Sequence, residues 1–331
     1  MKKNIAIIMG GYSSEADISL KSGSVVYTHL NKELYTAYSV HILKDKWVVL
    51  DAAANEYPIN KHDFSVRIHD KHITFDCVFN AIHGDPGENG KILAYFELLD
   101  IKHTSASSYQ MALTFNKRDT LSVVKAYGVK VATSIFFDKD DTYNVDEIIK
   151  KVGLPCFVKP NNAGSSFGIS KVSKKEDMQT AIEKAFAEDN ELLIEAFLDG
   201  VEVSIGIIEY KGKIKVLPAT EIVSFNDFFD HDAKYHGKSE EITPARISKI
   251  QLENLEKVAK QVYKVLNMRG FSRSEYIFIG DDPYFLEINT VPGLTDGSLL
   301  PQQVAKAGIS LEDLFGNAIE ASLNPSKGGN K

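Results

Sequence analysis

The sequence is poor in the residues that mark several protein classes. It has two cysteines and one tryptophan among 331 residues, and its formal net charge is −7, because Asp and Glu (45) outnumber Lys and Arg (38). Cys77 and Cys156 lie too far apart along the chain to suggest a disulfide framework, and we expect buried thiols in a reducing compartment. The negative charge disfavours a nucleic-acid partner, which usually meets a basic protein face.

Long apolar runs are also missing. No stretch reaches 18 apolar residues, so no membrane span and no membrane partner are expected. The chain begins MKKNIAIIMGGYSSEAD, and its apolar run ends at two glycines, too early for the apolar region of a signal peptide. The nine histidines show no metal-ligand spacing. Together these absences predict a cytoplasmic protein whose cores need no disulfide or metal.

Hydrophobic periodicity predicts three domains. Residues 4–9 form a continuous apolar run typical of a buried parallel strand, and a helical pattern follows from residue 15. A helix is expected over 109–126, and an amphipathic helix over 249–267. The expected division is an α/β domain over 1–104, a small α+β domain over 105–198, and a largely antiparallel domain over 199–331.

Residues 224–244 (SFNDFFDHDAKYHGKSEEITP) show no hydrophobic periodicity. A structureless stretch of about 20 residues inside a compact domain is usually a functional loop. We therefore expect residues 224–244 to form a functional loop.

The sharpest candidate site is a predicted hairpin over 273–289. Side chains alternate along a strand, so Arg273 shares a face with Glu275, and Glu287 shares one with Asn289. Folding one strand over the other places Glu275 roughly opposite Glu287, and such carboxylates repel unless a cation lies between them. Carboxylate and amide oxygens suit Mg²⁺, with phosphate oxygens completing its shell. The alternative is a solvated hairpin face with an incidental ion pair.

A second candidate is a glycine-rich loop beside a lysine. Lys159 ends an apolar strand just before NNAGSSFG (161–168), whose backbone amides and hydroxyls suit a phosphate group. The loop does not match the P-loop pattern, and a plain turn with a solvated lysine explains it equally well. Lys117 is a further candidate for a phosphate contact, although a surface helix lysine is the commoner case.

Two glycine-rich turns follow predicted strands of the first domain. HGDPGENG (83–90) lies at the strand edge where open α/β sheets bind ligands, and the alternative is an ordinary strand-to-helix turn. Gly10-Gly11 followed by Glu15 is a weak relative of the dinucleotide fingerprint. A dinucleotide-dependent dehydrogenase is therefore one alternative function, and the missing third glycine argues against it.

Taken in order, the motifs resemble those of the D-alanine–D-alanine ligase family of the ATP-grasp superfamily. The resemblance covers almost the whole chain: MGGYSSEADISL (9–20), HGDPGENG (83–90), FNKRDT (115–120), FVKPNNAGSSFGISKV (157–172), LIEAFLDGVEVSIG (193–206), DAKY (232–235), FSRSEYI (271–277) and FLEINTVPGLTDGSLLP (285–301). It implies a mixed α/β and α+β fold, with a Rossmann-like N-terminal domain followed by a two-domain ATP-grasp fold.

The resemblance also implies an activity. An enzyme of this family is an ADP-forming carbon–nitrogen ligase that joins two D-alanines through an acyl phosphate, for peptidoglycan and cell wall synthesis. D-lactate or D-serine as the second substrate is the alternative within the family. The implied cofactors are ATP and two Mg²⁺ or Mn²⁺ ions, and the implied assembly is a cytoplasmic homodimer. A nucleotide-binding protein without catalysis is the competing class.

Individual residues take roles from the resemblance. Glu15 is expected to hold the ammonium of the first D-alanine, with His83 nearby. Arg273 and the amide of Gly293 are expected to stabilise the oxyanion. The catalytic set is Glu15, Ser165, Tyr235, Arg273, Gly293 and Ser298, with Ser298 also on the second D-alanine. The ATP contacts are Lys117, Lys159, Ser166, Glu195, Ala196, Leu198, Glu202 and Lys234. The metal ligands are Glu275, Glu287 and Asn289.

Three positions depart from the family pattern. Glu275 stands where Asp is usual, Asn89 interrupts a Glu-Asp-Gly segment, and Asn116 replaces the usual Asp before Lys117. These departures concern metal geometry and positioning and leave the reaction class unchanged. A separate alternative concerns Ser298, whose hydroxyl is also suited to cap the helix that follows it.

Overall fold

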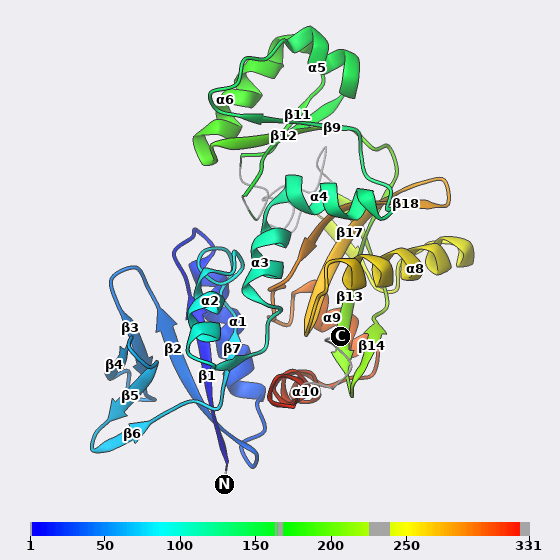
Figure 1. Cartoon of the computed structure of the whole chain (residues 1–331). Coiled ribbons are helices and arrows are strands. Elements are labelled where there is room, and N and C mark those ends of the chain that lie inside the picture. Colours follow the sequence, from blue (N-terminus) through cyan, green and yellow to red (C-terminus); the bar gives the residue numbers. More distant parts are fainter. Residues whose placement is uncertain (1, 163, 165–167, 225–238, 325–331) are drawn as a thin grey trace.

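The computed structural model describes residues 2–162, 164, 168–224 and 239–324, and its strands form three sheets (Figure 1). The first sheet has eight strands in the order β6-β5-β4-β3-β2-β1-β7-β8. Its strands are β1 (Lys3–Gly10), β2 (Tyr35–Ile42), β3 (Trp47–Leu50), β4 (Glu56–Asn60), β5 (Ser65–Ile68), β6 (Lys71–Ile73), β7 (Cys77–Asn80) and β8 (Lys102–His103). The helices α1 (Ala16–His29) and α2 (Lys91–Leu98) accompany this sheet.

The central strand β1 confirms the predicted buried parallel strand. It pairs in parallel with β2 on one side and with β7 on the other. Its residues from Ile5 to Gly10 are all buried, as expected for a strand covered on both faces. The strands from β3 to β6 extend the sheet in antiparallel fashion, so the sheet is mixed.

The single helix predicted over 109–126 is wrong, because two helices occupy this stretch. They are α3 (Ser108–Phe115) and α4 (Lys117–Ala126), and Asn116 separates them with an extended backbone. The Asn116 side chain accepts a hydrogen bond from the amide of Asp119 at 2.9 Å. This bond caps the start of α4 and places Lys117 in its first turn.

The second sheet has four strands in the order β11-β10-β12-β9. They are β9 (Ser134–Asp138), β10 (Cys156–Pro160), β11 (Ser170–Val172) and β12 (Glu191–Ala196), accompanied by α5 (Val145–Val152), the 3₁₀ helix η1 (Lys175–Asp177) and α6 (Met178–Glu188). Most apolar side chains of this region form a cluster of their own, including Val158, Met178 and Ile194.

The third sheet follows the order β16-β15-β13-β17-β18, with β14 beside β13. Its strands are β13 (Val201–Tyr210), β14 (Lys213–Val216), β15 (Thr220–Ser224), β16 (Ser239–Ile242), β17 (Phe271–Ile279) and β18 (Asp282–Asn289), and its helices are α8 (Lys249–Val265), α9 (Leu299–Lys306) and α10 (Leu311–Leu323). β16 corrects the expectation that all of 224–244 lacks regular structure, and residues 225–238 of that stretch lie outside the described residues.

The C-terminal helix α10 joins the first sheet to the third, as its place between them in Figure 1 shows. Phe315 of α10 packs edge-on against Phe79 of β7, with ring centroids 5.5 Å apart, and Phe79 also meets Phe271 of β17. The hydroxyl of Tyr35 donates to Glu320 at 2.9 Å. These two regions therefore share one buried core.

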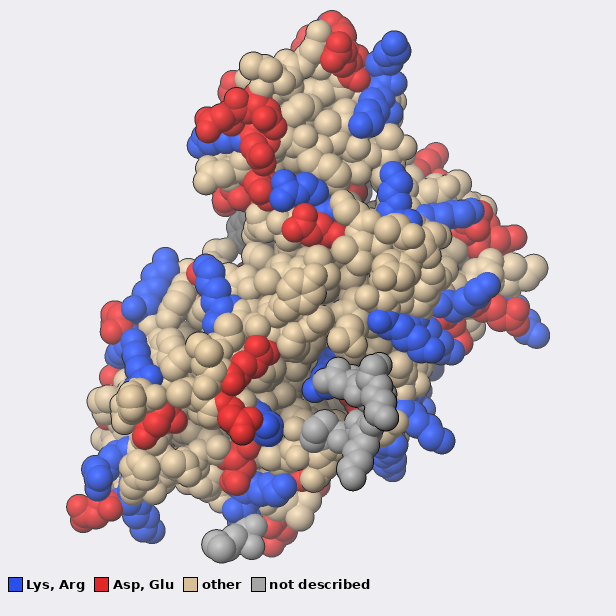
Figure 2. Space-filling model, in the orientation of Figure 1, with Lys and Arg blue, Asp and Glu red and all other residues tan. Residues whose placement is uncertain are grey.

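The surface carries mixed charge. Figure 2 shows Lys and Arg side chains interspersed with Asp and Glu over the visible face. Within the described ranges no helix has the length and apolar character to cross a membrane. Cys77 and Cys156 are both buried free thiols, as predicted.

Candidate active site

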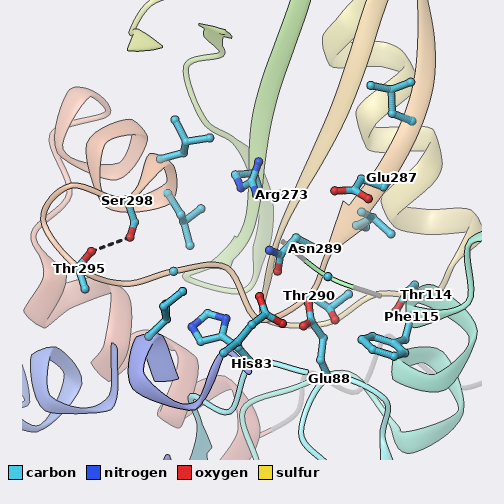
Figure 3. A pocket seen from close by; sticks show the side chains of 18 of the residues that line it. His83, Glu88, Thr114, Phe115, Arg273, Glu287, Asn289, Thr290, Thr295 and Ser298 are labelled. Atoms are coloured by element: carbon cyan, nitrogen blue, oxygen red, sulfur yellow. Dashed lines mark hydrogen bonds between the residues drawn. The ribbon is translucent and has the colours of Figure 1, made fainter. Parts of the chain in front are cut away.

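A pocket of about 370 Å³ gathers residues from distant parts of the chain. Figure 3 shows Arg273, Glu287 and Asn289 converging with His83 and Glu88 from the first region. Eight of the predicted site residues line the pocket: Glu15, His83, Lys117, Arg273, Glu287, Asn289, Gly293 and Ser298. Four others, Ser165, Ser166, Lys234 and Tyr235, lie outside the described residues.

The hairpin of β17 and β18 confirms the predicted register. Glu275 pairs with Glu287, Arg273 pairs with Asn289, and a β-bulge follows Glu275. Carboxylates in cross-strand positions repel one another. Each therefore has a cationic neighbour: Arg273 forms an ion pair with Glu275, and Lys117 Nζ lies 3.1 Å from Glu287 Oε2.

Arg273 remains charged despite its burial. Burial acts to lower its pKa, but the Glu275, Glu287 and Glu241 carboxylates more than offset this, and the net shift raises the pKa. Its Nη1 also donates to Ser204 Oγ at 2.8 Å. Arg273 is thus a fixed cation at the pocket wall, suited to stabilise a developing negative charge.

The donor set at the hairpin suits a hard divalent cation. Glu275 is buried, with 5% of its surface exposed, and two carboxylates and an amide face one region. Among the residues that the structure describes, no three His, Cys, Asp or Glu side chains form a complete metal cluster. A cation bound here would therefore need Asn289 and oxygens from a bound phosphate in addition to the two carboxylates.

Lys159 and Glu195 form a buried ion pair on the second sheet. Lys159 Nζ lies 2.7 Å from Glu195 Oε2, on neighbouring strands β10 and β12. Burial acts to lower the pKa of Lys159, but Glu195, Glu287 and Glu202 more than offset it, so the pKa is raised. Glu195 is 3% exposed, and its Oε1 has no hydrogen-bond partner among the described atoms. Of the remaining predicted ATP contacts, Ala196 ends β12, Leu198 lies in the connection that follows, and Glu202 lies on β13. Like the ion pair, they do not line the pocket.

Gly164, a described residue of the glycine-rich segment, lies close to Glu15. A Cβ atom at this position would lie 2.8 Å from Glu15 Oε2, closer than such contacts occur. The absence of a side chain at Gly164 therefore allows this backbone to approach Glu15, which lies at the start of α1. The two motifs are 149 positions apart in sequence and meet only in the folded chain.

Glu88 is a pocket residue to which the sequence analysis gave no role. Its Oε2 accepts from the amide of Gly84 at 3.0 Å. Burial, and then the nearby charge of Glu15, raise its pKa to about 7, while the Gly84 amide acts in the opposite direction. The available sequence signal was its place in HGDPGENG at the end of a buried strand. The shift itself arises from burial, with smaller contributions from Glu15 and Glu287, and none of these can be read from the sequence.

His83 links the first region to the loop after β18. It is 5% exposed, and its Nε2 lies 3.1 Å from Ser22 Oγ, which also accepts from the amide of Leu294 at 3.3 Å. Burial lowers the pKa of His83 to about 4, with the Val291 backbone acting in the opposite direction. His83 is therefore neutral near pH 7 and serves as a hydrogen-bonding group there.

Ser298 stands at the N-cap position of α9, but its side chain does not cap the helix. Its hydroxyl instead shares a hydrogen bond of 2.8 Å with Thr295 Oγ1. A Cβ atom at Gly293 would lie 2.7 Å from Ser298 Oγ, so the glycine keeps this hydroxyl beside the Gly293 backbone. The capping alternative for the Ser298 side chain is not what the structure shows.

Two departures from the family pattern have local explanations. Asn116 Nδ2 lies 3.4 Å from Glu191 Oε2, and Asn89 Nδ2 donates to Asp85 Oδ1 at 2.6 Å. An aspartate at either position would place two carboxylates together. Asparagine therefore avoids the repulsion that an aspartate would have with Glu191 at position 116 and with Asp85 at position 89.

Three sheets, partly buried lysines paired with carboxylates, and a carboxylate-bearing hairpin are the arrangement of an ATP-grasp ligase. The family models described as D-ala D-ala ligase N-terminus and D-ala D-ala ligase C-terminus match residues 4–106 and 123–320. The chain belongs to the D-alanine–D-alanine ligase family, whose members are ATP-dependent ligases.

Individual relatives span nearly the whole chain. A D-alanine–D-alanine ligase of Flavobacterium johnsoniae is 63% identical over 321 residues, covering 97% of this chain and 99% of that protein. One of Christiangramia forsetii is 57% identical over 324 residues, covering 98% and 99%. Among solved structures, the VanG D-Ala:D-Ser ligase of Enterococcus faecalis has a TM-score of 0.84 at 29% identity, covering 97% and 99%. A ligase of Bacillus anthracis complexed with ATP has a TM-score of 0.78 at 27% identity, covering 97% and 98%.

Proposed function

We propose that this chain joins two D-alanines in an ATP-dependent reaction that supplies the dipeptide for peptidoglycan synthesis. The observation that carries the proposal is the pocket where Glu15, Lys117, Arg273 and Glu287 converge from three parts of the chain. This arrangement offers an acid for a substrate ammonium, a cation for phosphate, and a fixed guanidinium for an oxyanion.

The chemistry needs an activated carboxylate. The first D-alanine takes the γ-phosphoryl group of ATP, which gives an acyl phosphate and ADP. The unprotonated amine of the second D-alanine attacks the carbonyl carbon, the C–N bond forms, and the C–O bond to phosphate breaks. In this scheme Glu15 holds the first ammonium, and Arg273 with the amide of Gly293 stabilises the tetrahedral oxyanion.

In this proposal, residues in and around the second and third sheets bind ATP. Lys117 and Lys159 contact the phosphates, together with Ser166 and Lys234. Their ion pairs with Glu287 and Glu195 hold both positive charges in place before phosphate arrives. Glu195, Ala196 and Leu198 contact adenine, and Glu202 contacts the ribose. The buried, unpartnered Oε1 of Glu195 supports the adenine contact, because an amino group would satisfy it.

Two divalent ions, Mg²⁺ or Mn²⁺, belong to the same proposal. Glu275, Glu287 and Asn289 would hold them, and the ions would supply positive charge to the transferring phosphoryl group. The opposed carboxylates of the hairpin support this role, because two acids in register gain from a shared cation.

The remaining parts follow the family. Ser298 binds the carboxylate of the second D-alanine, and His83 supports the first substrate site. Ser165 and Tyr235 complete a hydrogen-bonded set with Glu15, and residues 224–244 close as a lid. We place the enzyme in the cytoplasm as a homodimer, with three domains over 1–104, 105–198 and 199–331. D-lactate or D-serine in place of the second D-alanine is the alternative.

A phosphate-release assay tests the proposal. Purified protein with ATP and Mg²⁺ is expected to release phosphate only when D-alanine is present, with D-alanyl-D-alanine identified by mass spectrometry. L-alanine serves as the matched control. ATP turnover that ignores D-alanine, or that another amino acid triggers instead, contradicts the proposal.

A further inference from the structure

Glu241 is an acidic pocket residue to which the proposed function assigns no role. It lies on β16 and lines the pocket together with Arg273, Ser298 and Leu299. Ser298 and Leu299 stand where α9 begins, so Glu241 belongs to that end of the pocket. The second substrate is proposed to bind at that end, so the charge of Glu241 bears on which molecule can bind there.

A neighbouring amide holds the Glu241 carboxylate in place. Gln302 of α9 donates through Nε2 to Glu241 Oε2 at 3.0 Å and to the carbonyl of Gly297 at 3.1 Å. One side chain therefore ties Glu241 to the turn that directly precedes Ser298. A fixed carboxylate recognises a ligand at a lower entropic cost than a mobile one does.

The charges around Glu241 leave its carboxylate able to bind a cation. Burial raises the pKa of Glu241, while the Gln302 hydrogen bond and the charge of Arg273 act to lower it. Arg273 already pairs with Glu275 and Ser204. A partly desolvated carboxylate gains more from an approaching cation than an exposed one does, because water screens the pair less.

We propose that Glu241 selects the second substrate by binding its ammonium group. An α-amino acid carries its carboxylate and its ammonium on one carbon. With the carboxylate at Ser298 and the start of α9, the ammonium lies within reach of the same pocket wall. A hydroxy acid brings a neutral hydroxyl instead and forms no ion pair with Glu241. The inference rests on the proposed function and concerns binding alone, since no proton or bond is transferred to Glu241.

The test substitutes Glu241→Gln in the full chain, because Gln retains an oxygen for the Gln302 amide and removes only the charge. ATP, D-alanine, D-lactate and D-serine compete in one reaction, and mass spectrometry measures the products. The ratio of D-alanyl-D-lactate to D-alanyl-D-alanine is expected to rise roughly tenfold, the effect of losing a hydrogen bond to a charged group. The D-alanyl-D-serine ratio stays constant, since D-serine carries the same ammonium.

Glu240→Gln is the matched control. Glu240 is the preceding residue of β16, is exposed, and does not line the pocket. This variant is expected to leave both product ratios at their wild-type values. If Glu241 only balanced the charge of Arg273, the Glu241→Gln substitution would change the rate equally with every second substrate. Both product ratios would then stay constant.

An unchanged lactate ratio in the Glu241→Gln variant, or equal changes in both ratios, overturns the proposal. Where neither protein makes the lactate product, the KM for the second D-alanine decides: a rise of roughly tenfold with little change in kcat supports the role, and an unchanged KM overturns it. Failure of the proposed function has a different result, since wild-type protein would then show no D-alanine-dependent phosphate release at all.

Discussion

The raised pKa of Glu88 makes the stability of this protein depend on pH in a defined direction. The carboxyl has a pKa of about 7 in the folded chain against 4.5 as its ordinary value. Between these values the folded state holds a proton that the unfolded state has lost. The free energy of unfolding therefore falls as pH rises through this window, by about 3 kcal/mol in total.

The perturbation that isolates this effect is Glu88→Gln. Glutamine keeps an oxygen for the amide of Gly84 and has no proton to lose, so this component of the pH dependence disappears. Relative to the variant, wild-type protein is expected to lose about 2–3 kcal/mol of unfolding free energy between pH 5 and pH 8. Titrating groups that do not interact with Glu88 are common to both proteins and cancel in the difference.

Two measurements check this reasoning. Urea unfolding of both proteins at pH 5 and pH 8 gives the double difference, and ¹³C NMR of labelled Glu88 gives its pKa directly. Glu15→Gln serves as a control: removing the neighbouring charge is expected to lower the pKa of Glu88 and move the window to lower pH. A Glu88 pKa below 5, or a double difference near zero, refutes the argument.

Three further predictions concern other parts of the chain. Glu287→Gln removes one of two opposed carboxylates and is expected to reduce D-alanine-dependent phosphate release at least about 100-fold with an unchanged circular dichroism spectrum; a wild-type rate would contradict the metal role. Asn116→Ala removes the cap of α4 and is expected to cost about 1 kcal/mol in urea unfolding, and no loss would mean that the cap does not stabilise the fold. Phe315→Ala is expected to lower the free energy of unfolding by about 3–5 kcal/mol, because the Phe315 ring packs on Phe79 in the core shared by the first and third sheets. Independent unfolding of these two regions in the wild type would argue against a single core.

The charge distribution explains how a chain with a net charge of −7 suits an anionic nucleotide. Lys117, Lys159 and Arg273 each have an acidic partner at or near the hairpin. The pairs keep the cations ordered and charged in buried surroundings, where a lone cation would be costly. Net charge thus reflects the surface and carries little information about this site.

The sequence alone determined the features that depend on local periodicity. Alternation along β17 and β18, together with a short turn, predicted that Glu275 faces Glu287, and the register agrees. The apolar run at β1 predicted a buried parallel strand in the same way. The break at Asn116 was missed because the helical pattern continues on both sides, and only a capping residue interrupts it.

Tertiary structure decided everything that depends on groups far apart in sequence. The raised pKa of Glu88 arises from its burial and from the neighbouring charge of Glu15, and the Glu241 carboxylate accepts a hydrogen bond from Gln302 of α9. The shared core of the first and third sheets likewise depends on α10. Periodicity assigns a residue to a face of its own strand or helix. Burial, screening and charge depend on what the fold packs against that face.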